Sequence, residues 1–301
     1  MKKSVNKKSR SDASAARETR KPDRSQVFYV YCVGERDALD AMLAGELPPA
    51  IESGASLETV GGGELAAVVS GVAASDYGEA TLEARLADAQ WTAARAMRHE
   101  QVVEYFAARA SVVPLRFGTI YLERARVEAM LKERDAELRS IIARLRGRDE
   151  WGVNVFCDRA QLKERIAAVS PRLRELLQQA EQASPGQSYL MRKKVESLRA
   201  DETRVESKRI ASDIERALAA ASEGAARLRV LKGEAAEHGE LTAKLAYLVA
   251  RERFPHFRAE AERLAAAHAA LGFRMELTGP WPAYNFASGI EQDEEPIRGK
   301  G

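Results

Sequence analysis

QVFYVYCV, residues 26–33, is a continuous run of strand-favouring residues, and it sets how the first half of the chain folds. The run ends at Gly34, and an amphipathic stretch that predicts a helix follows. Residues 57–60 and 65–70 are two short apolar runs separated by three consecutive glycines. Because glycine adopts positive φ without steric cost, this pattern predicts a tight hairpin. The chain therefore opens as strand, helix, strand and strand.

Residues 79–109 and the stretch after them complete this first unit. The apolar residues of 79–109 recur at helical spacing and no proline interrupts them, so we predict one long helix. A short strand is expected at 111–113. The resulting order, βαββαβ, is that of ferredoxin-like folds, in which two helices cover one face of a four-stranded antiparallel sheet. We therefore predict a ferredoxin-like domain over residues 26–120.

The second half repeats this order after a connecting segment, residues 121–149, that contains a predicted helix at 124–146. A strand with a period of two follows at 151–157, and two helical stretches then meet at a Ser-Pro-Gly break, which predicts a helical hairpin. The remaining predicted elements are strands at 226–230, 245–249 and 273–277 and an Ala-rich helix at 256–271.

One of these strands is ambiguous. Residues 241–251 contain good helix formers and could extend into the next helix, so their assignment as a strand rests partly on symmetry with the first half. With that strand, residues 150–287 form a second ferredoxin-like domain with an inserted hairpin. The predicted fold class is α+β, with two antiparallel sheets joined by a helix.

Composition is that of a soluble globular chain of two domains. The chain has 301 residues, of which 31% are charged and 45% hydrophobic. It lacks both an apolar run of 18 residues and a secretory signal, so we expect a cytoplasmic protein without transmembrane segments. Cys32 and Cys157 each lie in an apolar run, which favours buried reduced thiols over a disulfide.

The charge is concentrated in the N-terminal tail. Residues 1–25 hold nine Lys or Arg and three acidic residues, a net charge of +6, which leaves −4 for the rest of a chain whose total is +2. Such a polar segment cannot bury enough surface to offset its ordering entropy, so we predict a disordered tail that is dispensable for folding and partner binding. Residues 288–301 are predicted to be a second loose tail.

No arrangement of residues indicates catalysis. The four histidines lack the spacing of a zinc site, and His99-Glu100 begins an HExxH motif whose second histidine is absent, so we interpret it as a solvated helix dipeptide. The sequence contains no nucleophile elbow, Walker loop or dinucleotide-binding glycine motif. We therefore expect neither enzymatic activity, nor a cofactor, nor a metal.

Two segments, each following the last strand of one half, differ from ordinary solvated loops. The first is Pro114-Leu115-Arg116-Phe117-Gly118-Thr119, and the second is Thr278-Gly279-Pro280-Trp281-Pro282-Ala283-Tyr284-Asn285-Phe286. The prolines beside Trp281 reduce the entropy lost on ordering, which suits either docking of a partner or sealing of one domain against the other. We expect mainly packing, with Arg116 and Phe117 in a similar role.

These segments, together with Glu150-Trp151-Gly152-Val153, Gly186-x-x-Tyr189-Leu190 and Tyr247-Leu248-Val249, resemble the gas vesicle GvpL/GvpF family in the same order over residues 27–287. The resemblance implies a two-domain α+β accessory protein of gas vesicle assembly. It would bind the small hydrophobic shell protein, and other accessory proteins, and limit shell-protein aggregation during nucleation. Catalysis is not implied. The resemblance leaves open whether the chain is of the L or F type and whether it stays on the finished vesicle.

Two other functions compete with this one. The βαββαβ order also underlies RNA-recognition modules, and residues 28, 29 and 31 are aromatic, but residues 27–33 contain no Lys or Arg. Nucleic acid is therefore not expected as a partner. A small-ligand enzyme would require convergent polar groups that the sequence does not offer. An apolar shell subunit, in contrast, could use an uncovered sheet face or an edge strand of such a domain.

Overall fold

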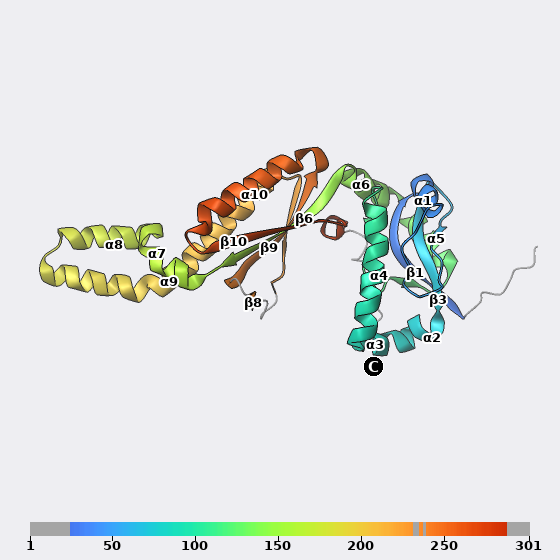
Figure 1. Ribbon diagram of the computed structural model, residues 1–301, viewed down its shortest axis with the longest axis horizontal. Helices are drawn as coiled ribbons and strands as arrows, with labels where there is room; N and C mark the ends of the chain where they lie inside the picture. Colours follow the sequence, from blue (N-terminus) through green and yellow to red (C-terminus); the bar gives the residue numbers. More distant parts are fainter. Residues whose placement is uncertain (1–24, 231–234, 237–238, 288–301) are drawn as a thin grey trace, which may run out of the picture.

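The computed structural model describes residues 25–230, 235–236 and 239–287. Figure 1 shows an elongated molecule, with the sheet of the N-terminal half at one end and a projecting helical hairpin at the other. The predicted tails at 1–25 and 288–301 lie outside the described residues, apart from Ser25.

The first half contains one antiparallel sheet and its covering helices. Its elements are β1 (Gln26–Glu35), α1 (Arg36–Leu43), β2 (Glu58–Val60), β3 (Leu65–Ala73), α2 (Ala74–Tyr77), α3 (Glu79–Ala87), α4 (Ala89–Ala107), β4 (Val113–Pro114) and β5 (Ile120–Tyr121). The strand order is β2-β3-β1-β4, and β5 pairs with an earlier part of β1. The first strand thus lies between the third and the fourth, as the βαββαβ order requires.

The helix predicted over 79–109 is interrupted. Asp88 has an extended backbone and its carboxylate accepts hydrogen bonds from the N–H groups of Gln90 and Trp91, so it ends α3 and caps α4. Helix α4 then packs on one face of the sheet through Val102, Val103 and other apolar residues. The last strand of the unit lies slightly later than predicted, at Val113–Pro114.

The other face of the first sheet is covered by α5 (Arg124–Glu133) and α6 (Asp135–Leu145). Val127, Leu131 and Leu138 are buried against strands β1 and β3. The segment predicted to be one connecting helix is thus two helices, broken at Arg134, that belong to the first core. Among the described residues, helices therefore cover both faces of the first sheet.

The second half forms another antiparallel sheet, with the order β10-β6-β9-β7 and a short β8 beside β9. Its elements are β6 (Arg148–Cys157), α7 (Arg159–Val169), α8 (Pro171–Gln182), α9 (Pro185–Ala220), β7 (Gly224–Leu228), β8 (Ala235–Ala236), β9 (Gly239–Ala250), the 3-10 turn η1 (Arg251–Arg253), α10 (Phe254–Ala269), β10 (Phe273–Trp281) and the 3-10 turn η2 (Tyr284–Phe286). The strand order again matches a βαββαβ unit. The prediction of an α+β fold with two antiparallel sheets is confirmed.

Helices α7, α9 and α10 cover one face of this second sheet, and α8 and α9 form the projecting hairpin (Figure 1). The first of the two predicted helical stretches is itself broken, because Ser170 caps α8 and Pro171 begins it. Ser170 also donates a hydrogen bond to the buried carboxylate of Glu202, which pairs with Arg172 (3.0 Å). These contacts fix the start of α8 to the middle of α9.

Candidate functional site

The two segments singled out in the sequence meet at the side chain of His99 on α4, which is only 2% exposed. Its Nε2 lies 3.1 Å from the carbonyl oxygen of Leu115 and 3.3 Å from the hydroxyl of Tyr284, so each segment supplies one neighbour. Its Nδ1 lies 3.0 Å from the hydroxyl of Tyr29. The interpretation of His99 as part of a solvated dipeptide is therefore wrong.

Burial sets the protonation state of His99. Desolvation lowers its pKa to about 4, although the hydrogen bond with the Leu115 carbonyl acts in the opposite direction. Because that carbonyl can only accept, Nε2 carries the proton of the neutral imidazole and Nδ1 accepts from the hydroxyl of Tyr29. The Tyr29 hydroxyl in turn accepts from the N–H of Gly118 at 3.0 Å. Both ring nitrogens of His99 are therefore held by hydrogen bonds within the protein.

The buried part of segment 114–119 packs around this network. Leu115 is buried, and its N–H donates to the carbonyl oxygen of Tyr31 at 2.9 Å. The ring of Phe117 lies edge-on to the imidazole of His99, with 5.9 Å between the centroids. Leu115 and Phe117 thus pack within the first half.

The rest of this segment forms the turn that brings Phe117 inward. Pro114 is buried and opposite Cys32 in the sheet register, and Gly118 has a φ of +88°, a conformation that favours glycine. The hydroxyl of Thr119 donates to the carbonyl oxygen of Arg116 at 2.8 Å. The side chain of Arg116 is exposed.

Segment 278–286 leaves the second sheet and docks against the first half. The Tyr284 hydroxyl donates to the carboxylate of Glu100 at 3.0 Å. The backbone N–H and the side-chain amide of Asn285 donate to the two oxygens of Glu150, at 2.9 and 2.5 Å. Burial raises the pKa of both carboxyl groups. Through Tyr284 the segment thus forms a polar junction with the first half, and Asn285 anchors the segment to β6 of the second half.

Trp281 is the aromatic residue of this segment that the junction leaves at the surface. It is 45% exposed, and its indole N–H donates to the hydroxyl of Thr278 at 3.2 Å. Gly279 and Pro280 are joined by a cis peptide bond, and Pro282 is buried. The packing role expected of the segment therefore falls to Tyr284 and Phe286, which contact the cores of the first half.

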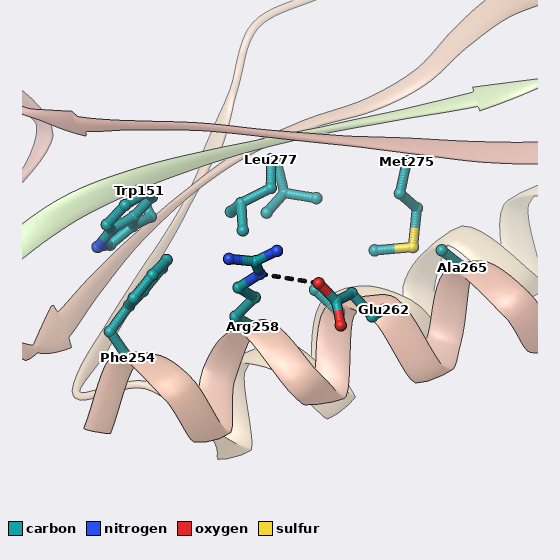
Figure 2. A pocket seen from close by; sticks show the side chains of 9 residues that line it. Trp151, Phe254, Arg258, Glu262, Ala265, Met275 and Leu277 are labelled. Carbon is teal, nitrogen blue, oxygen red and sulfur yellow. Dashed lines mark hydrogen bonds and ion pairs between the residues drawn. The ribbon is translucent and has the colours of Figure 1, made fainter. Parts of the chain in front are cut away.

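A separate apolar groove of about 410 Å³ lies between α10 and the second sheet (Figure 2). It is lined by Trp151, Val153, Phe254, Arg258, Ala261, Glu262, Ala265, Met275 and Leu277. Figure 2 shows Trp151, Leu277 and Met275 pointing from the strands toward the helix. The rings of Trp151 and Phe254 stack with centroids 3.8 Å apart, and Arg258 donates to Glu262, one turn further along α10, at 2.8 Å. The groove combines aromatic walls with one exposed ion pair.

The Tyr189-Leu190 motif lies in neither place. Both side chains are 65% exposed on α9, near the end of the projecting hairpin. The structure therefore distributes the candidate residues over the junction, the groove and the hairpin. It does not bring them together into one site.

Within the described ranges, no helix is long and apolar enough to cross a bilayer. The same residues contain no group of three His, Cys, Asp or Glu side chains that could hold a metal ion. Cys32 and Cys157 are both free and buried, and desolvation raises the pKa of each thiol.

Comparison with known proteins identifies the family. Residues 27–288 match the family described as gas vesicle synthesis protein GvpL/GvpF. The chain belongs to this family. It is 31% identical over 236 residues to gas vesicle protein L of Streptomyces sp. (strain CB03234), covering 77% of this chain and 83% of that protein. It is 27% identical over 196 residues to gas vesicle protein F of the same strain, covering 63% and 76% of the two chains.

Solved structures of the GvpL/GvpF family share the fold. The crystal structure of GvpF from Anabaena sp. PCC7120 aligns with a TM-score of 0.59 at 16% identity, over 87% of this chain and 96% of that one. GvpF from Microcystis aeruginosa aligns with a TM-score of 0.53 at 17% identity, over 87% and 98%.

Sequence reasoning did not place His99 or Phe254 among the candidate residues, and it named Glu150 only as part of a family motif. A signal for His99 was present, because it shares one helical face with Val102 and Phe106, at the spacings i+3 and i+7. The contact between Phe254 and Trp151 joins positions more than 100 residues apart, and no local pattern predicts it.

Proposed function

We propose that this GvpL/GvpF family member is a non-enzymatic assembly protein of gas vesicles, which binds the hydrophobic shell protein in the cytoplasm and limits its aggregation during nucleation. Family membership supports the gas vesicle role. The observation that carries the binding proposal is the apolar groove between α10 and the second sheet.

The groove has the chemistry that an apolar segment requires. Trp151, Met275 and Leu277 are only partly buried, so a partner can remove their remaining apolar surface from water at a gain of about 25 cal/mol per Å². Stacked aromatic side chains in a concave site are typical anchors of a binding hot spot. The exposed pair of Arg258 and Glu262 can interact with polar groups of the partner at the rim.

Two structural features argue for this function over the others that the sequence left open. Tyr29 and Tyr31 are fully buried beneath α4, so they cannot form the stacking surface that an RNA-recognition sheet uses. The most perturbed histidine, His99, is enclosed by hydrogen bonds within the protein, which supports a structural role. These features argue against an RNA-recognition sheet and against a catalytic histidine, and they favour the proposed binding function.

We expect Ala265→Glu to weaken capture of purified shell protein at least about tenfold, because it places a charge in the apolar groove. Glutamate favours helix, so α10 should remain folded. Ala266→Glu, one residue away on the exposed side of α10, is the matched control and should bind like the unmodified protein. Capture of the shell protein measures binding, and light scattering measures how far the shell protein aggregates. Equal binding by both variants, with equal melting temperatures, would rule out this groove as the site.

A further inference from the structure

The outer edge of β10 has the features of a strand that pairs with another chain. β10 lies at the end of the order β10-β6-β9-β7, and within the described ranges no strand pairs with its other side. Its register with β6 is regular from Phe273 to Thr278, before an irregularity that includes Pro280. Such a free edge presents unpaired backbone N–H and carbonyl groups.

We propose that this edge pairs with the same edge of a second copy of the chain, antiparallel about Met275, to join the two second-half sheets into one. In this register Arg274 faces Glu276 of the second copy and Glu276 faces its Arg274. Phe273 and Leu277 face each other in the same reciprocal way. The sequence Phe-Arg-Met-Glu-Leu is therefore self-complementary, as a two-fold interface requires.

The charges of β10 favour this occupant over an unrelated strand. Arg274 and Glu276 interact within one copy at 2.9 Å, and their side chains are 48% and 33% exposed, so they are available for exchange across the edge. Opposite charges that face each other across an antiparallel pair are stabilising, and like charges are destabilising. Arg274 of each copy faces Glu276 of the other copy only when the two-fold axis passes through Met275.

The apolar side of the strand supports the same register. Phe273, Met275 and Leu277 alternate with the charged residues and face the helix-covered side of the sheet. In the paired sheet, these three residues would lie beside the same three residues of the second copy, on one continuous apolar face. Because a single strand pair buries less surface than a standard interface, the dimer should be weak and concentration-dependent.

Charge reversal tests the pairing. We expect Glu276→Arg alone, or Arg274→Glu alone, to weaken self-association about tenfold in sedimentation velocity, because each places like charges opposite each other twice. An equimolar mixture of the two variants should recover association, since both cross-strand pairs again become opposite. A protein that is monomeric at every concentration, or whose association is unaffected by these variants, would overturn the proposal.

Cross-linking tests the register independently. Facing Cα atoms of antiparallel strands lie within the range of a disulfide, so Met275→Cys should give a covalent dimer under a mild oxidant. Thr278→Cys is the control on the same strand, because the two cysteines would lie about 20 Å apart in this register. Cys32 and Cys157 are buried and give a low background. If Met275→Cys gives no covalent dimer while the protein still captures the shell protein, the dimer is refuted and the proposed function stands.

Discussion

Replacement of Tyr284 by alanine is expected to lower the free energy of unfolding by about 3 kcal/mol and to detach the end of the second sheet from the first half. The ring of Tyr284 packs against the core beneath α4, and its hydroxyl is held by Glu100 and His99. Removing a large aromatic side chain from such a position leaves a cavity, and the half-buried carboxylate of Glu100 loses the hydroxyl that donates to it. Urea denaturation measures the loss, and small-angle scattering should detect a longer molecule.

Two further variants test the role of Tyr284, one by removing only its hydroxyl and one by removing a neighbouring aromatic side chain. Tyr284→Phe keeps the ring and removes the hydroxyl, so it should cost about 1 kcal/mol. Trp281→Ala removes a larger side chain, but one that is 45% exposed, and we expect it to cost less than Tyr284→Ala. A larger loss from Trp281→Ala would show that Trp281, and not Tyr284, closes the junction.

The order of strands was predictable because alternation and turn residues are local signals. The strand at Gly239–Ala250 formed despite its good helix formers, since Tyr247 and Val249 are buried between neighbouring strands and helices. Helix ends were less well predicted. Asp88 and Ser170 are ordinary N-cap residues, yet the continued apolar spacing around each suggested unbroken helices.

The candidate site was predictable only in part, because its geometry depends on contacts between distant segments. The two segments after the last strands were recognised in the sequence, but their meeting point, His99, lies in neither. The covering of the first sheet by α5 and α6 was missed for the same reason. Apolar spacing identifies the buried side of a helix but not the sheet against which it packs.

The second large effect expected is a loss of stability in acid that depends on His99. The pKa of this residue is lowered to about 4 in the folded protein, from an ordinary value of 6.5, because the charged imidazole would be buried beside Tyr29 and Leu115. Neutral His99 contributes its full stability above pH 6.5. This contribution to the free energy of unfolding is lost as the pH falls toward 4, because the unfolded chain binds the proton more tightly. The shift corresponds to about 3 kcal/mol.

Glu100 and Glu150 act in the opposite direction, because burial raises the pKa of each carboxyl and favours its neutral form in acid. The effect of His99 must therefore be isolated by comparison with His99→Gln, which keeps an amide donor for the Leu115 carbonyl and has no imidazole. In urea denaturation, the unmodified protein should lose about 3 kcal/mol more unfolding free energy than His99→Gln between pH 7 and pH 4. Replacement of the exposed His256 by glutamine is the control. Parallel stability curves for the unmodified protein and His99→Gln over this range would contradict a neutral, buried imidazole at the junction.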